Sequence, residues 1–494
     1  MPKKNELAIE ETLDPQDWDS MRELGRRMVD DVFDYLEELP RQPAWRHAPE
    51  VIKANFEYPP PPNPQSPEAI YDEYLQYIQP YGLGNNHPRF WGWVGGTGTV
   101  IGALAEFLVA ATNTPSGAFS YMSPNYVEIQ VLNWFKEMFG FPLDASGLLT
   151  SGCSASNLIG LAVARNAKAN IDVRKDGLHA APEEMVLYAS EETHSSLQKA
   201  VELLGLGSNA LRRIPVNDVL QIDLGALKAA IRVDRDHGFL PFCIIGSAGT
   251  TNTGAIDDLN ALADICQKEE LWYHIDGAFG AWAILAPKSK RLVDGMERAD
   301  SLAFDLHKWM YLPYAIGGVL IRDEEKHRKA FSLTPTYLAH GEGTRGLTGE
   351  DVPWISDYGF QLSRTFPALK AWMTIKEHGV EKYVRLIQQN IDQAHYLAGL
   401  VEKDSELEMA MPVSLNVVCF RFARTDTDES QLDELNKHIE VELQEQGIAI
   451  PSIVVLHGRK YLHVAITNHR SRREDFDLLV QEVKRLGRGF VPSR

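Results

Sequence analysis

The sequence predicts an α/β protein whose core is a mostly parallel β-sheet covered by helices on both faces. From about residue 148, short apolar runs alternate with helical runs, an order typical of parallel sheets. Polar side chains directly follow several of these apolar runs. The 494 residues are 44% hydrophobic and 24% charged, the composition of an ordinary globular enzyme of one large or several smaller domains.

Net charge and cysteine usage exclude several classes of protein. Lys and Arg number 49 and Asp and Glu 68, a net charge of −19, so neither nucleic acid nor an anionic membrane is an expected partner. The four cysteines are far apart, without CxxC or metal-binding spacing, which favours reduced thiols in a cytoplasmic protein without a metal site. Residues 1–11 lack the apolar core of a signal peptide, and the apolar window 100–111 is too short to span a bilayer.

The N-terminal region predicts helices joined by a stiff connector. Asp14-Pro15 and Asp17 are typical of a helix start, and apolar residues then recur at helical spacing until Pro40. This apolar stripe can pack on its own chain or on a partner subunit. Six of the ten residues 58–67 are proline, which favours an extended segment before a second helix.

Six short apolar runs are predicted strands of the main sheet. They span residues 148–150, 185–189, 243–246, 271–275, 301–304 and 318–321, with helices expected between several of them. Ser151, His194, Thr250, Asp276 and Lys308 each come just after one of these runs. Because ligands bind at the carboxyl ends of parallel strands, we expect these side chains to share one site.

The composition changes after residue 380. A long helical run over 380–403 is followed by an alternating strand at 415–422 and a helix at 429–445. Another strand at 461–467 and a last helix at 473–486 complete the pattern. This order predicts a smaller α+β domain.

Lys308 and Asp276 form the most informative pair of the sequence. Asp276 lies 32 residues before Lys308. A lysine amine can form a Schiff base with pyridoxal phosphate, and a carboxylate can keep the pyridine nitrogen protonated so that the ring withdraws electrons from a substrate. Taken alone, a lysine after a strand is usually a surface charge and an acid there a turn former.

Residues 150–157 (TSGCSASN) form a small, hydroxyl-rich turn that opens a helix. Backbone N–H groups, the positive helix end and serine hydroxyls can bind an anion there; a capped helix without a ligand is the alternative. Ser156 stands where a GxSxG nucleophile elbow needs its second glycine, which disfavours a serine hydrolase. No GxGxxG follows a strand and no GxxxxGK[ST] occurs, so no dinucleotide or P-loop site is predicted.

Three further segments can contribute to a ligand site. His194 can stack on a flat ring or transfer a proton, or it can simply cap the next helix. The polar loop 249–254 can hold a small ligand or form an ordinary turn. Residues 331–351 contain Tyr337 and four glycines, and such a loop can close over a substrate or lie on the surface without a role.

These motifs together resemble the group II pyridoxal-phosphate-dependent amino-acid decarboxylases, the family of the aromatic-L-amino-acid decarboxylases. The resemblance is most specific at His307-Lys308-Trp309, at its spacing from Asp276, at residues 193–196 (THSS) and at 336–338 (TYL). It implies the fold type I of pyridoxal-phosphate-dependent transferases, with a seven-stranded central sheet. The implied domains are an N-terminal helical dimerisation segment (1–86), a large cofactor-binding domain (87–378) and a small α+β domain (379–494).

The resemblance also implies roles around the cofactor ring. Lys308 would carry pyridoxal phosphate, Asp276 would pair with the ring nitrogen, Ala278 would pack against the ring, and His194 would stack on the opposite face. Thr251 would contact the side of the cofactor.

Other residues would line the phosphate pocket or act on the substrate. Cys153, Ser154 and His307 would surround the phosphate. Tyr337 would deliver the proton to Cα after carbon dioxide leaves, and its hydroxyl favours decarboxylation over the aldehyde-forming chemistry of relatives that lack it. The resemblance further implies a homodimer with the active site at the subunit interface.

The chain departs from the family pattern near the substrate. Leu306 replaces a usual proline, Ala155 a frequent glutamate, and residues 94–97 a bulkier pocket wall. Phe90, Trp91 and Trp93 provide an aromatic wall. Ser363 stands where pocket depth is set in the family, and a serine there leans toward phenolic or imidazole side chains. We therefore expect a carboxy-lyase acting on an aromatic L-amino acid.

Alternatives remain open on the same scaffold. Acidic or diamino acids can be the substrate, or the enzyme can form aldehydes or catalyse another pyridoxal-phosphate reaction. A catalytically silent binding protein is disfavoured because Lys308 and Asp276 are both present.

Overall fold

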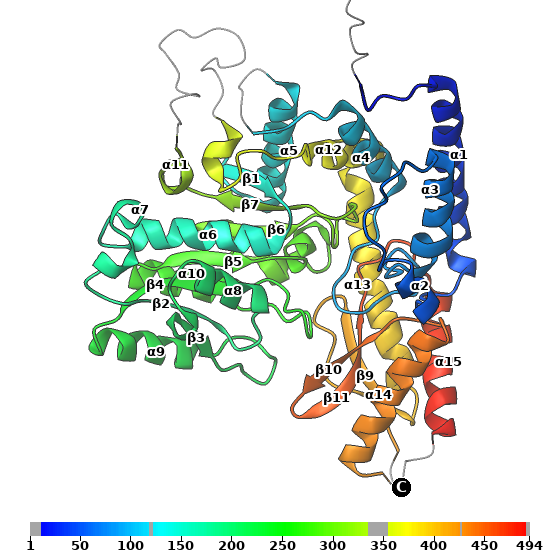
Figure 1. The fold of residues 1–494 in the computed structure, drawn as a ribbon. Coiled ribbons are helices and arrows are strands. Elements are labelled where there is room, and N and C mark those ends of the chain that lie inside the picture. Colours follow the sequence, from blue (N-terminus) through cyan, green and yellow to red (C-terminus); the bar gives the residue numbers. More distant parts are fainter. Residues whose placement is uncertain (1–10, 118–121, 334–353, 425–426, 491–494) are drawn as a thin grey trace, which may run out of the picture.

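The computed structural model describes residues 11–117, 122–333, 354–424 and 427–490. Its elements form two β-sheets with their covering helices, and a group of N-terminal helices lies along one side (Figure 1). The long helix α13 (Val380–Glu402) runs from the large-sheet part to the small-sheet part.

The large sheet has seven strands in the order β1-β7-β6-β5-β4-β2-β3. The strands are β1 (Ser146–Thr150), β2 (Met185–Ser190), β3 (Leu211–Ile214), β4 (Leu240–Ser247), β5 (Trp272–Asp276), β6 (Ser301–Asp305) and β7 (Gly317–Ile321). Four neighbouring pairs are parallel, and only β7 runs against its neighbours β6 and β1. The predicted mostly parallel, seven-stranded α/β fold is confirmed.

The direction of β7 follows from the length of the preceding connection. A parallel crossover needs a dozen or more residues and usually a helix, whereas residues 306–316 join β6 to β7 without an α-helix. The chain therefore turns back in this segment. The predicted cofactor lysine, Lys308, lies in this turn.

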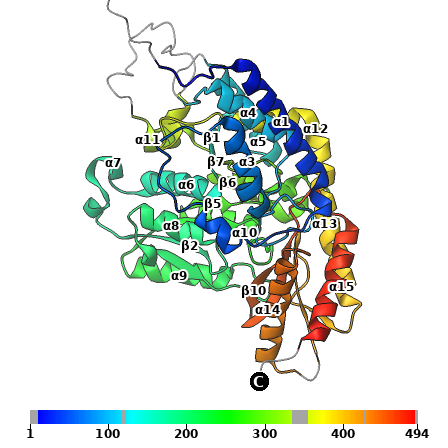
Figure 2. The ribbon, with the colours of Figure 1, turned by 45° about the vertical axis from the view of Figure 1, so that its right-hand side comes forward.

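Helices cover both faces of the large sheet. Helices α5 (Ser123–Phe139), α6 (Cys153–Lys168), α9 (Leu224–Asp236) and α10 (Leu259–Glu269) pack directly on its strands, and α8 (Ser195–Leu203) shares an apolar core with them. The same part of the chain also holds α4 (Val100–Thr112), α7 (Val173–Asp176), α11 (Glu324–Phe331) and α12 (Ala368–His378). Helix α6 lies along β5, β6 and β7 (Figures 1 and 2). Strands β2, β5, β6 and β7 are buried along their whole length, as expected for a sheet covered on both sides.

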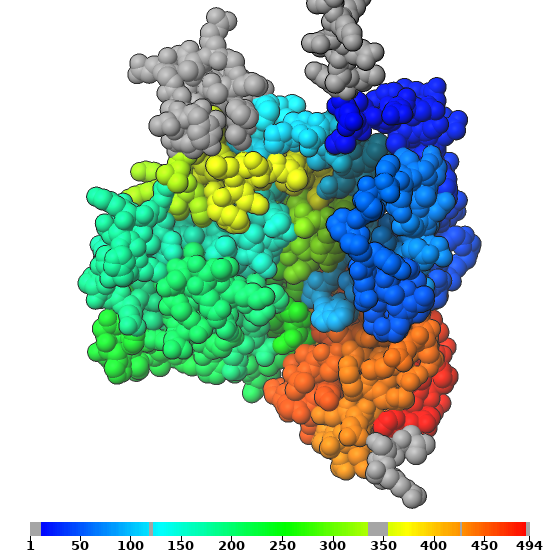
Figure 3. All heavy atoms as spheres, viewed as in Figure 1, coloured from blue at the N-terminus to red at the C-terminus, as the bar shows by residue number. Residues whose placement is uncertain are grey.

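The N-terminal helices are α1 (Trp18–Glu38), α2 (Glu50–Ala54) and α3 (Pro67–Glu73). The Asp17 carboxylate caps α1 by accepting from the N–H groups of residues 19 and 20, so a helix is present here but begins three residues later than the predicted start with Asp14 as cap and Pro15 in the first turn. Only Leu24 of α1 is buried, while Trp18, Val32 and Phe33 are exposed. In Figure 3 this blue segment forms one side of the molecule, next to the orange and red C-terminal part.

The small sheet is antiparallel, with the order β10-β11-β9-β8. Its strands are β8 (Leu407–Met409), β9 (Val417–Phe422), β10 (Ser452–Leu456) and β11 (Arg459–Ala465). Helices α13, α14 (Glu429–Glu445) and α15 (Arg473–Gly489) share its apolar core. The boundaries predicted for the three domains stay a prediction. Arg89 and Trp91 hydrogen-bond through their backbones to Ile450, and Trp91 also to Ala465 at the end of β11.

Within the described ranges, no helix is long and apolar enough to cross a membrane. The same part of the chain holds no group of three or more His, Cys, Asp or Glu side chains placed to bind a metal ion.

Candidate active site

Lys308 lies just beyond β6, with its side chain largely buried. Its Nζ atom is 3.3 Å from Oδ2 of Asp305. Burial alone would lower the pKa of the amine, but the nearby charges, led by Asp305 and including Asp276, outweigh that effect and raise the pKa. In this structure, Lys308 is therefore a buried cation held by carboxylates.

The turn that carries Lys308 is fixed on both sides. The N–H groups of Leu306 and His307 both donate to the carbonyl of Ile316, at 3.1 and 3.2 Å. The indole of Trp309, which is 0% exposed, donates to Asn390 Oδ1 on α13 at 3.0 Å. Because residues before and after it are anchored, the backbone of Lys308 is held in a fixed position.

Asp276 ends β5 and has three donors around its carboxylate. Oδ1 accepts from the Ala278 N–H at 3.2 Å and from the Cys153 thiol at 3.4 Å, and Oδ2 accepts from the Asn157 amide at 3.1 Å. Cys153 and Asn157 reach the same carboxylate because positions i and i+4 share one face of helix α6. These three donors fix the orientation of the carboxylate.

The N-terminus of α6 lies beside Lys308 and His307. The exposed Ser151 and Ser154 flank the first helical turn, where N–H groups and the helix dipole favour an anion. Gly152 has φ +150°, and a Cβ there would lie 3.3 Å from His307 Cε1. Asp305 Oδ1 accepts from the Cys153 N–H at 2.6 Å, so this particular donor is already engaged by a carboxylate.

His194 is the N-cap of α8, and its imidazole is exposed. Its Nδ1 accepts from the Ser196 N–H at 3.2 Å, so the proton of the neutral ring is on Nε2. Partial burial lowers the pKa of the ring, and the charges of Asp276, Lys308 and Asp305 also act on it. These electrostatic interactions bring His194 into one group with the lysine and the two acids.

Three other predicted cofactor contacts lie on neighbouring loops. The carbonyl of Thr251 accepts from His463 Nε2 at 2.9 Å, so the loop after β4 is tied to β11. The His307 ring packs against the Tyr314 ring with centroids 4.4 Å apart and an angle of 35° between the planes. Ala278 is partly exposed next to Asp276.

The predicted substrate residues have different surroundings. Trp91 is 1% exposed, stacks on Phe476 and donates to Ser471 Oγ at 3.0 Å. This packing favours a core role for Trp91, and its substrate contact stays a prediction. Phe90 is 5% exposed and clusters with Ala44 and Ile450.

Ser363 and Tyr337 are the remaining residues of the predicted site. Ser363 is exposed, and its neighbour Arg364 forms a buried ion pair with Glu128. Tyr337 lies outside the described residues, as do its neighbours in the segment 334–353.

Sequence reasoning missed Asp305, Asn157 and Tyr314. Asp305 ends β6 as Asp276 ends β5, so the same strand-end rule could have identified it. Asn157 could have been found from its i+4 spacing to Cys153. No pattern marked Tyr314, whose hydroxyl accepts from the Gly96 N–H at 3.0 Å through a contact between distant segments.

The residues present fit pyridoxal phosphate. The primary amine of Lys308 suits the aldehyde, and the Asp276 carboxylate with its three donors suits a protonated ring nitrogen. The glycine-opened N-terminus of α6 suits the phosphate. Asp305 accepts from the Cys153 N–H at this helix end, so its negative charge opposes a second anion there.

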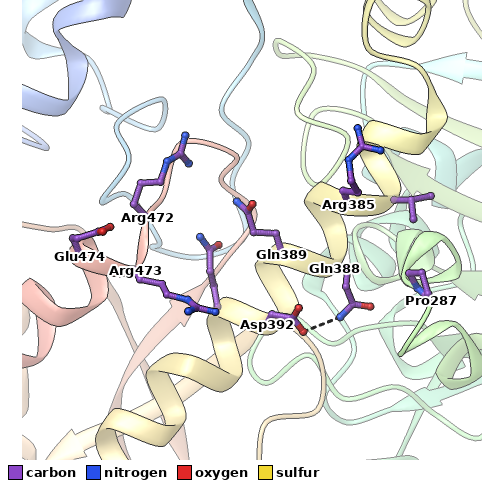
Figure 4. Close-up of a pocket in the computed structure, with 10 residues that line it drawn as sticks. Pro287, Arg385, Gln388, Gln389, Asp392, Arg472, Arg473 and Glu474 are labelled. Atoms are coloured by element: carbon purple, nitrogen blue, oxygen red, sulfur yellow. Dashed lines mark hydrogen bonds between the residues drawn. The ribbon is translucent and has the colours of Figure 1, made fainter.

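A separate cleft of about 620 Å³ lies between α13, the start of α15 and the segment around Pro287 (Figure 4). Arg385 and Gln388 line it from α13, where the Gln388 amide donates to Asp392 at 3.0 Å. The cleft contains none of the predicted site residues.

Comparison with known proteins gives a consistent result. Residues 49–423 match the family model of the pyridoxal-dependent decarboxylase conserved domain. The chain is 34% identical over 475 residues to an aromatic-L-amino-acid decarboxylase of Bacillus atrophaeus, covering 95% of both chains. It is 29% identical to tryptophan decarboxylase 2 of Oryza sativa, covering 92% of each, and 27% identical to phenylacetaldehyde synthase of Arabidopsis thaliana, covering 96% of this chain and 98% of the relative.

Solved structures agree on the fold. The crystal structure of Oryza sativa TDC with PLP and tryptamine superposes with a TM-score of 0.88 at 24% identity, covering 97% of this chain and 99% of that one. Catharanthus roseus tryptophan decarboxylase in complex with L-tryptophan gives a TM-score of 0.86 at 22% identity, covering 96% and 100%.

Proposed function

The chain belongs to the pyridoxal-dependent decarboxylases, and on this premise we propose that it converts an aromatic L-amino acid to the amine and carbon dioxide. One observation supports this most directly. Cys153 donates to Asp276 through its thiol and to Asp305 through its N–H, and Asp305 lies 3.3 Å from the Lys308 amine, so the amine and the predicted acid share one site. The aromatic substrate class is supported by the relatives that decarboxylate aromatic amino acids.

The chain's own residues would hold the cofactor at three places. Lys308 would hold it covalently, Asp276 would keep its ring nitrogen protonated, and His194 would stack on one ring face. When bound, pyridoxal phosphate supplies an electron sink for the bond that breaks at the substrate Cα. Ser154 and His307 would line the phosphate position, with Thr251 and Ala278 beside the ring.

Each of these residues performs an elementary task. The Asn157, Cys153 and Ala278 donors hold the Asp276 carboxylate in a fixed orientation. Asp305 stabilises the protonated Lys308 amine whenever that amine is free. We assign the proton delivered to the substrate Cα to Tyr337, and water exclusion to the loop 331–351.

Aldehyde formation is the second candidate, since one relative over nearly the whole chain is a phenylacetaldehyde synthase. The hydroxyl of Tyr337 favours plain decarboxylation. Acidic and diamino acids are further substrates to screen.

The experiment is a product assay with purified protein, supplied pyridoxal phosphate and the twenty amino acids plus dihydroxyphenylalanine. We expect carbon dioxide and amine in equal amounts from one or more aromatic substrates, without ammonia or hydrogen peroxide. Lys308→Ala should abolish both turnover and the mass increase obtained when the loaded protein is reduced with borohydride. Stoichiometric ammonia and peroxide would instead identify an aldehyde synthase, and no turnover of any aromatic amino acid would refute the proposal.

We also propose a homodimer with its active sites at the interface, located in the cytoplasm. The exposed apolar residues Trp18, Val32 and Phe33 of α1 and Phe107 of α4 support an interface on the N-terminal helices. All four cysteines are free and buried, which fits a reducing compartment. Sedimentation equilibrium of the full chain tests the dimer, and a monomer at micromolar concentration would contradict it.

A further inference from the structure

We propose that Trp272, Ser301, His274 and Asn157 form a chain of hydrogen bonds with a single direction, which holds the Asp276 carboxylate in place and aims the Asn157 amide nitrogen at its Oδ2. These four are positioning residues, since none is assigned a contact with substrate or cofactor. The inference rests on the proposed function, because it takes Asp276 as the partner of the cofactor's ring nitrogen.

The chain is continuous at hydrogen-bond distances. Trp272 Nε1 donates to Ser301 Oγ at 2.8 Å, and Ser301 Oγ lies 2.7 Å from His274 Nδ1. His274 Nε2 lies 2.9 Å from Asn157 Oδ1. The Asn157 amide nitrogen then donates to Asp276 Oδ2 at 3.1 Å.

The fold aligns these residues for a simple reason. Residues 272, 274 and 276 alternate along β5, so their side chains point to the same face of the sheet. Ser301 pairs with His274 in register on the neighbouring strand β6, and Asn157 approaches from α6. Trp272 is 2% exposed and Ser301, His274 and Asn157 are all 0% exposed, so water does not compete with these bonds.

Both ends of the chain impose the same direction. An indole N–H can only donate, and an ionised carboxylate can only accept. Asn157 must therefore turn its nitrogen to Asp276 and its oxygen to His274. His274 must donate from Nε2, and its unprotonated Nδ1 accepts from the Ser301 hydroxyl, which itself accepts from Trp272.

The state of His274 agrees with this direction. Burial lowers the pKa of its imidazole to about 4, so the ring is neutral and one nitrogen is free to accept. A neutral imidazole with one donor and one acceptor nitrogen satisfies both neighbours.

The reverse direction would cost a hydrogen bond. If Asp276 Oδ2 donated to Asn157, the amide and the imidazole would both have to reverse, and His274 and Trp272 would then both donate to Ser301. In the part of the chain that the structure describes, the Ser301 hydroxyl has only these two partners, so its own proton would have no acceptor. Loss of one buried hydrogen bond opposes this reversal, so the chain keeps the Asn157 amide nitrogen, and not its oxygen, against Asp276 Oδ2.

Gly160 supports a specific place for the imidazole. It lies inside α6, where a glycine is normally unfavourable. A Cβ at this position would lie 2.7 Å from His274 Cε1 and 2.9 Å from His274 Nδ1. The missing side chain leaves the room that the ring needs to reach Asn157.

A second buried histidine provides an internal control. His327 Nδ1 lies 2.8 Å from Ser146 Oγ, and His327 Nε2 lies 2.8 Å from the carbonyl of Tyr358. Like His274, His327 is 0% exposed and bonded to a serine. Its chain ends on a backbone carbonyl and not on Asp276, so Ser146→Ala makes the same chemical change without touching the predicted site.

The test compares Ser301→Ala with Ser146→Ala in the full-length protein. We measure the Kd of pyridoxal phosphate by titrating cofactor-free protein, and the ¹⁵N chemical shift of the ring nitrogen after reconstitution with labelled cofactor. Ser301→Ala is expected to raise Kd roughly tenfold, the effect of one lost hydrogen bond, and to shift the ¹⁵N signal toward the unprotonated ring. Ser146→Ala should leave both near wild type, with thermal unfolding reporting that each variant is folded.

If the Ser301→Ala protein fails to fold, a second pair of variants, at His274, provides the test. His274→Gln keeps a donor near the position of Nε2, whereas His274→Leu has none. Better cofactor affinity and a more protonated ring in His274→Gln than in His274→Leu would support the chain. Wild-type Kd and ¹⁵N shift in both would overturn it.

The outcomes separate this inference from the proposed function. If wild-type protein decarboxylates aromatic substrates while the Ser301 and His274 variants keep wild-type Kd and ¹⁵N shift, only the chain is refuted. If Ser301→Ala shifts the ring signal but no aromatic amino acid reacts, the chain stands and the proposed substrate class fails. If Asp276→Asn leaves the ring signal unchanged, the shared assignment of Asp276 is wrong and the chain falls with it.

Discussion

The carboxylate of Asp305 lies 3.3 Å from the amine of Lys308 and accepts from the N–H of Cys153 at 2.6 Å. One buried acid therefore contacts both the residue that would bind the cofactor aldehyde and the helix end that would bind its phosphate. Both contacts should slow the covalent attachment of the cofactor, since attachment needs a neutral Lys308 amine and places a second anion near Asp305.

We predict that Asp305→Asn accelerates covalent attachment of pyridoxal phosphate at neutral pH. Removing the carboxylate lowers the pKa of Lys308, and each unit of decrease makes about tenfold more neutral amine available. The Asn oxygen can still accept from Cys153, so the helix end keeps its partner. Stopped-flow absorbance of cofactor-free protein measures the rate, with the exposed substitution Asp264→Asn as control; an unchanged or slower rate in Asp305→Asn would contradict the prediction.

Gly160→Ala should destabilise the protein, contrary to the usual effect of alanine in a helix. The new methyl would lie 2.7 Å from the ring of His274, so the ring or the helix must move. Gly399→Ala in α13 is the matched control, because a Cβ added there would meet no atom within 4 Å, and it should stabilise by about 0.5–1 kcal/mol. Urea unfolding of both proteins measures the difference, and equal stabilisation would show that the ring is not confined.

Lowering the pH should already destabilise the fold at pH values well above the pKa of its carboxylates. Burial is the main cause that lowers the pKa of five histidines, to about 4 for His87, His274, His463 and His469 and to about 3 for His327. Unfolding restores their usual pKa of 6.5, so the unfolded chain binds more protons between pH 6.5 and 4. Their contribution is complete above pH 6.5 and is lost as the pH falls toward 4, by up to about 1.4 kcal/mol per pH unit for each histidine.

Urea unfolding at several pH values measures this slope. Asp257 acts in the opposite direction, since burial raises its pKa to about 6, but it offsets only one of five groups. His327→Gln should reduce the pH dependence of the free energy of unfolding by about the contribution of one histidine. His438→Gln, at a partly exposed position, should not change it. A stability that does not change between pH 7 and 5 would refute the prediction.

Arg364→Met should destabilise the protein by roughly 3–5 kcal/mol. Arg364 and Glu128 form a buried ion pair with N–O distances of 2.8 and 3.2 Å, and Glu128 Oε1 also accepts from the Leu149 N–H at 3.1 Å. Removing the arginine leaves a buried carboxylate without its charge partner. The double variant with Glu128→Gln should lose less than the sum of the single changes, and strict additivity in chemical unfolding would contradict the coupling.

The sequence allowed the strands and their ligand-bearing ends to be predicted because both depend on local pattern. Six of the seven strands of the large sheet are predicted by their apolar runs, and the residues that follow β5 and β6 lie together. Strand β3 escapes this pattern because its four residues include Arg212 and Arg213 and it lies at the sheet edge. The antiparallel direction of β7 depends on the length of the connection before it, which apolar periodicity does not report.

The remainder of the site depends on contacts between distant segments. Asp305 and Asn157 could have been found by spacing rules, whereas Tyr314 and the core position of Trp91 could not. Trp91 follows Phe90 in an aromatic run and therefore resembles a pocket aromatic, but its partners Phe476 and Ser471 lie almost four hundred residues away in the chain. Such packing is invisible to any local pattern.

The segment 90–98 connects the turn that carries Lys308 to the C-terminal part of the chain. Its backbone bonds to Ile450 and Ala465 at one end, and Gly95 O accepts from the Thr467 hydroxyl in the middle. A Cβ on Gly96 would lie 1.5 Å from the carbonyl of His307, so this segment is pressed against the lysine turn. A polypeptide that ends at residue 378 would keep Lys308 but lose the C-terminal residues that hold the segment 90–98 in place. The cofactor-binding part expressed alone should therefore have a distorted active site.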